Sequence, residues 1–343
     1  MRKLLNTLFV TSEDVYLALE NENVIVYRED EKAAQYPLQM LESILCFSYK
    51  GASPALMGAC VRQGVQLSFL TPGGRMLARA AGMSQGNVLL RKEQYRVSDQ
   101  PERSCLVARN MIFGKAYNAR WVLERTLRDH AMRVEAGRLR EASAHLQQQL
   151  RPLLSADSLD VLRGLEGEAS ACYFGVLDEL ILNQKEDFRF AGRNRRPPLD
   201  RVNAALSMTY TLLTHDCAAA LESVGLDAYA GFMHRDRPGR MSLALDLMEE
   251  LRAPLADRLV LTLINTRALQ KQHFRLQSGG AVLLTDEGRK ALLGAWQNKK
   301  KEEITHPYLK EKLPWGLVPY VQALLLARHL RGDLEAYPPF LWK

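Results

Sequence analysis

The chain has 343 residues, of which 47% are hydrophobic and 25% charged. At roughly 150 residues per domain, this length predicts about two domains, each large enough to bury a hydrophobic core. The composition excludes a disordered protein, a collagen-like repeat and a small scaffold held together by disulfides. The formal net charge of +7 permits a polyanionic partner but does not establish one.

The positive charge is unevenly distributed along the chain. Residues 1–85 carry eight Lys or Arg and eight Asp or Glu, so the whole excess belongs to the rest of the chain. Residues 88–140 alone carry twelve basic and six acidic side chains. If the protein contacts nucleic acid, we therefore expect its second part to do so.

The lengths of the apolar runs and the spacing of the cysteines indicate the cellular compartment of the protein. The sequence has no run of about 18 apolar residues, so we expect no transmembrane helix, and its first residues lack the pattern of a signal peptide. The five cysteines are widely spaced and form no C-x-x-C pair, which argues against zinc ribbons and a disulfide framework. We expect reduced, mostly buried thiols in a cytoplasmic protein.

The first part of the chain has the pattern of short strands. Runs rich in apolar, β-branched and aromatic residues predict strands at the start of the chain and at residues 15–19, 24–27, 43–49, 65–71 and 75–81. Residues 21–23 are a predicted hairpin turn, and residues 54–63 a helix closed by Gly64. The small, polar stretch 82–87 is a candidate linker. We expect a β-rich domain over residues 1–85 and a linker over residues 86–92.

From about residue 88 the periodicity becomes helical. Residues 104–150 are predicted to be mostly helix, with basic residues between apolar positions at helical spacing. Further helices are predicted at residues 158–182, 198–221, 243–275 and 317–330, with breaks at 183–197 and 235–241. The sequence therefore predicts an α+β fold, in which a small β domain precedes a larger all-α domain over residues 93–343.

Glu166 lies on the apolar side of the predicted helix at residues 158–182. It follows Leu162 by four residues and precedes Ala169 by three, whereas Glu168 is turned about 200° and should face water. A carboxylate on a core-facing stripe is costly unless it is paired or binds a metal. Two nearby glycines would let a backbone or a ligand approach closely. The alternative is a salt bridge between Glu166 and an arginine in the core.

A second group of polar residues begins at His234, which follows two apolar residues and opens an arginine-rich loop. Farther on, Asp246 and Glu249 lie three residues apart on one face of a predicted helix. Glu250 is turned about 100° from Glu249 and is expected to be solvated.

Carboxylates and an imidazole from these two segments could form a metal site for phosphate chemistry. Carboxylate oxygens suit Mg²⁺ and Mn²⁺, and one imidazole shifts the preference toward Mn²⁺. Such an ion could activate an attacking oxygen and stabilise charge in the transition state. The alternative is that Asp246 and Glu249 only pair with Arg252 or Arg240.

Four motifs, in order and at matching spacing, resemble one family. They are G-L-E-G-E-A-S-x-x-Y-F at residues 164–174, N-A-A-L-S-x-x-Y at 203–210, G-F-x-H at 231–234 and L-A-L-D-L-M-E-E-L-R at 243–252. Together they resemble the universal CRISPR-associated integrase of spacer acquisition, from the first strand to about residue 280. This resemblance implies an N-terminal β-sandwich followed by an α-helical catalytic domain. The segment R-F-A-G-R-N-R-R-P-P at 189–198 resembles more particularly the subtype I-C branch.

The resemblance also implies site residues. Carried over position by position, the catalytic metal ligands are Glu166, His234 and Glu249, and they would hold Mg²⁺ or Mn²⁺. Asp246 matches the preceding acid of the family's D-x-x-[DE] motif, as an accessory acid that contacts metal or water. The third ligand is Glu here where some members have Asp, so its reach is longer. Asn203 matches a motif position near the active site.

Arginines in two loops are expected to bind DNA. Those beside Phe188 and Phe190 would bind phosphates while the rings stack on bases, and those after His234 would hold the scissile phosphate. The residues are Arg189, Arg193, Arg195, Arg196 and Arg201 in the first loop, and Arg235, Arg237 and Arg240 in the second. Residues 88–140 would follow the duplex backbone. For each arginine, the alternative is an ordinary solvated loop.

The sequence does not support an esterase or a nucleotide-binding site. Residues 82–86 match the esterase pattern G-x-S-x-G, but the helices downstream do not supply the alternating strands and helices that this motif requires. The sequence has no P-loop or dinucleotide-binding motif, which fits a transesterification that needs no nucleotide energy.

The combined hypothesis is a metal-dependent DNA endonuclease and integrase, in which a 3′-hydroxyl of a short duplex attacks a phosphodiester at a repeat boundary. The resemblance implies a homodimer joined through the β domain and a small ferredoxin-like Cas partner in a heterohexamer-type complex. In a subtype I-C system it also implies a Cas exonuclease. The rival hypotheses are a non-catalytic DNA-binding scaffold and a stand-alone repair nuclease for branched DNA.

Overall fold

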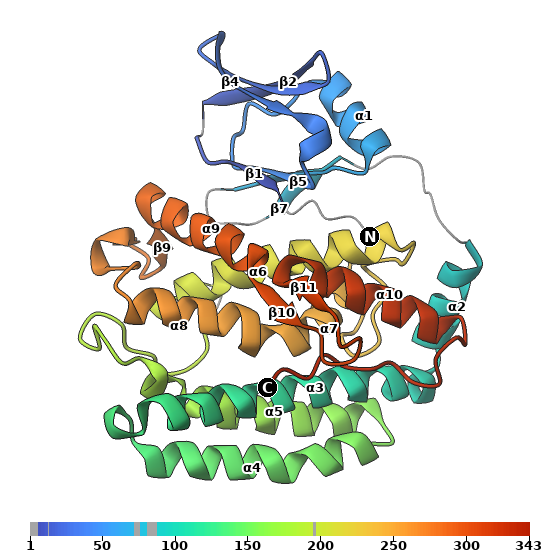
Figure 1. The fold of residues 1–343 in the computed structure, drawn as a ribbon, viewed down its shortest axis with the longest axis vertical. Helices are drawn as coiled ribbons and strands as arrows, with labels where there is room; N and C mark the ends of the chain where they lie inside the picture. Colours follow the sequence, from blue (N-terminus) through green and yellow to red (C-terminus); the bar gives the residue numbers. More distant parts are fainter. Residues whose placement is uncertain (1–5, 13, 72–75, 81–87, 195–196) are drawn as a thin grey trace.

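A computed structural model describes residues 6–12, 14–71, 76–80, 88–194 and 197–343. Its strand-rich N-terminal part lies above a larger, mostly helical part (Figure 1). Within the described ranges, no helix is long and apolar enough to cross a membrane.

Two sheets and one helix make up the N-terminal part. The first sheet has the order β1-β5-β6-β7, with parallel pairing except between β6 and β7. The second is an antiparallel meander of β2, β3 and β4. The bounds are β1 Thr7–Val10, β2 Val15–Glu20, β3 Asn23–Arg28, β4 Glu31–Pro37, β5 Ser43–Cys46, α1 Pro54–Gln63, β6 Gln66–Leu70 and β7 Met76–Arg79.

Local sequence explains several of these elements. Asn21 and Glu22, between β2 and β3, both have positive φ, as a two-residue turn that follows the twist of the strands requires. Helix α1 has the predicted bounds and ends at Gly64, which adopts the left-handed conformation. Strand β4 was not predicted, because all of its side chains are exposed or half-buried and its sequence lacks an apolar face.

The β1-β5-β6-β7 sheet is buried on both faces. Ile44 and Cys46 pack into the core between the two sheets, whereas Leu45 and Phe47 pack into the core of the helical part. This alternation follows from the period of two along a strand. Ion pairs add to the contact, since Arg79 pairs with Glu222 in the helical part.

The helical part is built from nine α-helices among the described residues. In Figure 1, α4 lies farthest from the sheets, with α5 and α3 above it, and α6 and α9 lie next to the β1-β5-β6-β7 sheet. The bounds are α2 Val88–Ser98, α3 Pro101–His130, α4 Ala136–Ser155, α5 Leu159–Gly175, α6 Arg201–Ser223, α7 Ser242–Leu251, α8 Arg258–Asn265, α9 Asp286–Lys301 and α10 Val318–Leu330.

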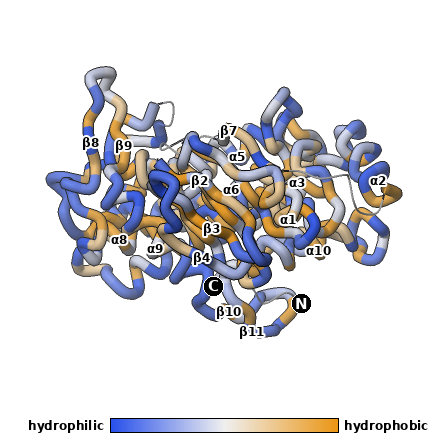
Figure 2. Tube along the Cα trace, turned by 90° about the horizontal axis from the view of Figure 1, so that it is seen from above, coloured by the Kyte–Doolittle hydropathy of each residue, from blue (hydrophilic) through white to orange (hydrophobic). Residues whose placement is uncertain are grey.

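Shorter elements connect these helices. A π-helical stretch, Arg252–Asp257, joins α7 to α8. Two hairpins, β8 with β9 and β10 with β11, interrupt the helices, and β8–β9 lies at the opposite end of the molecule from α2 in both views (Figures 1 and 2). Strand bounds are β8 Phe274–Leu276, β9 Val282–Leu284, β10 Glu303–Thr305 and β11 Lys312–Pro314. Short 3₁₀ turns occupy Leu38–Met40, Ala131–Arg133, Leu177–Leu180, Lys271–His273 and Trp315–Leu317.

The fold class is thus confirmed, with corrections. The second part is mostly helical rather than all-α, because of the two hairpins. The predicted helix over 104–150 is two helices, since the chain reverses at Ala131–Arg133 so that α4 packs back on α3. The helix predicted to reach residue 275 ends at Asn265.

The predicted linker also differs from the structure. Helix α2 begins at Val88, so residues 88–92 of the linker predicted over 86–92 are helical. The candidate linker 82–87 and the esterase-like motif at 82–86 lie outside the described residues. The boundaries between residues 1–85 and 93–343 stay a prediction.

The C-terminal residues pack against α3 and α7. Asn118 of α3 donates to the Glu250 and Phe340 carbonyl oxygens and accepts from the Trp342 amide. Gly114, one turn earlier, lies so close to this contact that a Cβ atom would be 3.0 Å from the Glu250 Cβ and 3.2 Å from the Pro339 Cβ. The absence of a side chain at Gly114 lets the three segments meet.

We predict that Gly114→Ala lowers the free energy of unfolding by about 1–3 kcal/mol, because the added methyl group overpacks this contact. Gly294→Ala is the matched control, since a Cβ there meets nothing within 4 Å on an exposed helical turn. It should stabilise the protein by about 0.5–1 kcal/mol. Urea unfolding measures both. Equal effects of the two substitutions would contradict the close packing at Gly114.

Candidate active site

A cavity of about 390 Å³ opens where α3, α5, α7 and the loop after Gly231 meet. Two glutamates, one histidine and five arginines are among its ten lining residues: Ile112, Arg163, Glu166, Met233, His234, Arg235, Arg237, Arg240, Glu249 and Arg252. The structure therefore brings together the three residues expected as catalytic ligands, and the three arginines that follow His234.

Asp246 fixes the loop that carries His234. Its fully buried carboxylate accepts hydrogen bonds from the backbone N–H groups of Phe232 at 2.6 Å, Met233 at 2.9 Å and His234 at 3.0 Å. A Cβ at Gly231 would lie 2.9 Å from Asp246 Oδ2, so this close approach requires glycine. Asp246 thus positions the loop from behind, away from the cavity lining.

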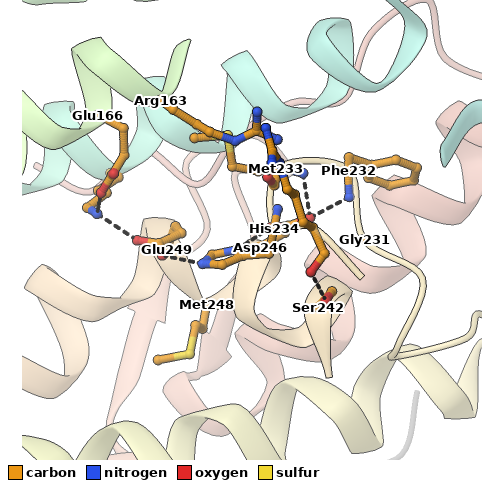
Figure 3. Close-up of polar contacts among 12 residues, drawn as sticks. Arg163, Glu166, Gly231, Phe232, Met233, His234, Ser242, Asp246, Met248 and Glu249 are labelled. Atoms are coloured by element: carbon orange, nitrogen blue, oxygen red, sulfur yellow. Dashed lines mark hydrogen bonds and ion pairs between the residues drawn. The ribbon is translucent and has the colours of Figure 1, made fainter. Parts of the chain in front are cut away.

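The same carboxylate sets the orientation of the imidazole. Asp246 Oδ1 lies 2.6 Å from His234 Nδ1, and because this carboxylate already accepts three backbone N–H groups, Nδ1–H is the donor in this hydrogen bond. Nε2 is then left with a lone pair on the side of Glu249, whose Oε1 lies 3.8 Å away. In Figure 3, Glu166 and His234 lie on either side of Glu249. This carboxylate–imidazole pairing is common behind histidine ligands of metals.

Glu249 is almost fully buried, with 3% of its side chain exposed, and is surrounded by cations. Arg252 lies 3.0 Å from Oε1, and the Lys115 ammonium lies 2.9 Å from Oε2. Burial alone would raise the pKa of Glu249, but the Arg252 and Lys115 cations hold that pKa low, at about 2. Glu249 is therefore an ionised carboxylate at the base of the cavity.

Glu166 reaches the cavity from α5. Its side chain is 26% exposed, pairs with Lys115 and accepts a 2.8 Å hydrogen bond from Ser170. Glu168 is 55% exposed and pairs instead with His145. The helical-wheel argument therefore distinguished the two acids correctly, although Glu166 is half-buried rather than fully inward.

The ion-pair alternatives are also present. Glu249 pairs with Arg252, as one alternative predicted, and Glu166 pairs with Lys115 rather than with an arginine. A Cβ at Gly164 or Gly167 would meet no atom within 4 Å, so these glycines do not serve close packing within the chain.

The donor set fits a divalent ion, but the side chains as placed do not enclose one. Among the described residues, no three His, Cys, Asp or Glu side chains form a group that could hold a metal. Lys115 forms an ion pair with both Glu166 and Glu249. Glu249 Oε2 is buried, and its nearest cation is the Lys115 ammonium at 2.9 Å. Two carboxylates and one imidazole are suitable Mg²⁺ or Mn²⁺ ligands.

Sequence reasoning missed Arg163 and Arg252 as residues that line the cavity, and Lys115 as the partner of two of its glutamates. Arg163 pairs with Asp160 and donates to the Met233 carbonyl oxygen at 3.2 Å, so it ties α5 to the His234 loop. Lys115 follows Met111 by four residues on the buried side of its helix. The wheel argument used for Glu166 could therefore have identified Lys115.

The arginines of the first loop have different environments. Arg189 is exposed, whereas Arg201 donates to the Asp187 carbonyl oxygen and Arg193 lies over the Tyr210 ring, 5.1 Å from its centre. Arg195 and Arg196 lie outside the described residues. None of the described members of this set, Arg189, Arg193 and Arg201, lines the cavity.

The expectation for the two phenylalanines of this loop needs correction. Phe188 and Phe190 are buried, with ring contacts to Phe274 and Phe174, so they cannot stack on bases. Their apolar surface fills the core instead.

Asn203, expected near the active site, is fully buried and does not line the cavity. Its side chain holds the loop, with Nδ2 donating to the Gly192 carbonyl oxygen at 2.8 Å and Oδ1 accepting from Arg193. Its link to the site is indirect, because Arg193 and Arg252 both lie 5.1 Å from the centre of the Tyr210 ring.

The expectation that Glu250 is solvated is wrong. Its carboxylate is fully buried and accepts hydrogen bonds from Gln322, Tyr337 and the Phe340 backbone N–H. The C-terminal residues, far away in sequence, supply these donors and the cover. Burial raises the pKa of Glu250 to about 7, although the three donors oppose that rise.

We predict that Asp246→Asn disturbs the tautomer of His234, because the amide no longer offers an anionic acceptor to Nδ1–H. Nitrogen NMR at mildly alkaline pH should show one tautomer in the wild type and a mixture in the variant. Asp160→Asn, at an exposed carboxylate, is the control. An unchanged imidazole spectrum in Asp246→Asn would show that Asp246 does not set the tautomer.

Glu250 should make the protein less stable as pH rises. Its pKa is about 7 in the folded state and 4.5 ordinarily, so the folded state binds more protons between these values. The free energy of unfolding should fall by about 3 kcal/mol between about pH 5 and about pH 8 from this group. Chemical unfolding should show a flatter pH profile for Glu250→Gln, whereas the exposed-site control Glu168→Gln should keep the wild-type slope.

Comparisons with known proteins identify the family of this chain. A sequence model of the family described as CRISPR associated protein Cas1 matches residues 8–298. A CRISPR-associated endonuclease Cas1 of Rhodospirillum rubrum is 52% identical over the full length of both chains. A Geobacter sulfurreducens fusion of exonuclease Cas4 and endonuclease Cas1 is 34% identical over 97% of this chain and 60% of its own length.

Solved structures share the fold. A casposase bound to an integration product has a TM-score of 0.83 at 21% identity, over 98% of this chain and 94% of its own. A Cas1 protein of Thermotoga maritima has a TM-score of 0.81 at 22% identity, over 95% of this chain and 97% of its own. With the family match over most of its length, the chain belongs to the CRISPR-associated Cas1 family of endonucleases.

Proposed function

We propose that this protein is a metal-dependent DNA endonuclease and integrase of CRISPR adaptation, which inserts short duplex DNA into the repeat array. The observation that carries the proposal is the convergence of Glu166, Glu249 and His234 with five arginines on one cavity. Acidic and imidazole ligands suit a divalent ion, and arginines suit the phosphate on which it acts.

Glu166, Glu249 and His234 Nε2 would hold the Mg²⁺ or Mn²⁺. A bound divalent ion supplies Lewis acidity toward a phosphoryl oxygen and favours deprotonation of the attacking hydroxyl or water. The ionised state of Glu249 and the Asp246-oriented imidazole prepare two of the three ligands.

The arginines would bind and orient the scissile phosphodiester. Arg235 and Arg237 are exposed at the mouth of the cavity, so they can reach backbone phosphates of a long duplex. Arg163, tied to the Met233 carbonyl oxygen, keeps the His234 loop in place while a substrate binds. Arg189, Arg193, Arg195, Arg196 and Arg240 are further proposed DNA contacts, with Asn203 supporting Arg193.

In the reaction, a 3′-hydroxyl oxygen of the incoming duplex attacks the phosphorus at the repeat boundary. The 3′-oxygen of the repeat strand leaves and takes up a proton, so one phosphodiester replaces another and no nucleotide is consumed. Water in place of the hydroxyl would give the endonuclease reaction. The casposase of similar fold is bound to an integration product, which supports strand transfer as the main activity.

The proposed organisation follows the family resemblance. The β-rich residues 1–85 would join a homodimer, and residues 93–343 would carry the catalytic, DNA-binding domain. We propose a small ferredoxin-like Cas partner in a heterohexamer-type complex, and a Cas exonuclease that processes incoming ends. The Cas4/Cas1 fusion of Geobacter sulfurreducens supports the exonuclease. The proposed branch is subtype I-C, and the proposed compartment is the cytoplasm, where the array lies.

An integration assay tests the function. Labelled duplex ends, a supercoiled repeat plasmid, Mn²⁺ and the partner protein should give joined products with the wild type and none with Glu166→Ala, which loses a proposed ligand. Glu168→Ala is the matched control, because it removes an exposed carboxylate two residues away.

The rival hypotheses give different outcomes in the same assay. Binding without cleavage or joining would indicate a DNA-binding scaffold. Cleavage of branched DNA without joining would indicate a stand-alone repair nuclease. Joining that survives Glu166→Ala would refute the proposed site.

A further inference from the structure

Lys115 occupies the middle of the proposed metal site. Its side chain comes from α3, is 11% exposed, and contacts Glu166 of α5 and Glu249 of α7 at once. Ile112, one turn earlier on α3, lines the cavity. The lysine stem therefore lies beside the cavity, and its ammonium bridges two of the proposed ligands.

The charges around Lys115 are balanced. Two carboxylates face the Lys115 ammonium and the Arg252 guanidinium, which lies 3.0 Å from Glu249. The two are not equivalent, because Arg252 contacts Glu249 Oε1 whereas Lys115 contacts both Glu249 Oε2 and Glu166. Arg252 can thus stay in place while only the lysine blocks the space between the two acids.

A divalent ion and this ammonium cannot share the same oxygens without repulsion. Like charges a few ångströms apart repel strongly where water is largely excluded. Ion binding through Glu166 and Glu249 would therefore require the ammonium to leave. A lysine stem is flexible, and the adjoining cavity is where a phosphate would lie, so an anionic phosphate could receive the displaced ammonium.

We propose that the Lys115 ammonium competes with the divalent ion for Glu166 and Glu249. This competition keeps the affinity for the ion low until a DNA phosphate binds the ammonium instead. This inference rests on the proposed metal site. The ion and DNA then bind cooperatively. The ion releases the Lys115 ammonium from the two carboxylates, and a DNA phosphate neutralises the released ammonium.

Mn²⁺ binding, followed by the EPR signal of the free ion, tests the proposal. Lys115→Met keeps the stem and removes the charge, so the full-length variant should bind Mn²⁺ about tenfold more tightly than the wild type without DNA. A short blunt-ended duplex should tighten Mn²⁺ binding to the wild type and have a smaller effect on the variant, after subtraction of Mn²⁺ bound by DNA alone.

Two further variants control for charge and folding. Lys271→Met removes a lysine that pairs with Asp187 on the surface, and it should leave Mn²⁺ affinity unchanged. Lys115→Arg keeps a cation between the acids and should not tighten binding. If Lys115→Met fails to fold, Lys115→Gln takes its place, and tighter binding is again expected.

The outcomes separate this inference from the proposed function. Mn²⁺ binding that is lost in Glu166→Ala but no tighter in Lys115→Met would overturn only the competitor role. If Lys115→Met binds Mn²⁺ more tightly but DNA tightens that binding as much as in the wild type, the proposed contact of the ammonium with a phosphate would be overturned. Mn²⁺ binding that is insensitive to Glu166→Ala would overturn both the metal site and the inference.

Discussion

A carboxylate removed from water needs donors or cations inside the protein, and α7 carries three buried carboxylates within five residues. Each has its own partners. Asp246 is held by the backbone of the His234 loop, Glu249 by cations from α3 and from the residue that follows α7, and Glu250 by neutral donors from α10 and the C-terminal residues. Because these partners come from separate parts of the chain, one short helix determines where the loop, α3 and the C-terminal residues lie. The active-site geometry follows from meeting these three requirements at once.

Local pattern predicted much of the fold. Helix α1 and the strands β2 and β3 follow from propensity, turn residues and a capping glycine, all of which act over a few residues. Strand β4 was not predicted, because its side chains are exposed or half-buried and give no apolar alternation. The reversal between α3 and α4 was not predicted, because helix-forming residues continue through it. Only the packing of α4 on α3 decides where the chain turns. Tertiary contact overrides local preference at such positions.

The position of a site residue could be predicted where the spacing along one helix determines whether its side chain is buried. Helical spacing separated Glu166 from Glu168, and the structure places the first at the cavity and the second in solvent. Spacing within α7 placed Asp246 and Glu249 together but assigned Glu250 to water, because its cover comes from residues about 90 positions later. Spacing also places Lys115 on the buried side of its helix, but its partners lie on two other helices, so its pairing could not be predicted from that helix alone. Motif resemblance located the ligands, whereas the cation between them emerged only from the folded chain.

The doubly buried β1-β5-β6-β7 sheet has a consequence for how the protein is held together as a whole. Its inner strands contribute side chains to both hydrophobic cores, so the β-rich residues cannot separate from the helices without wetting Leu45, Phe47 and Leu70. A boundary that composition and charge make conspicuous in the sequence is therefore bridged by shared apolar surface. Separating the two parts would expose this apolar surface to water, so the contact between them contributes to the stability of both.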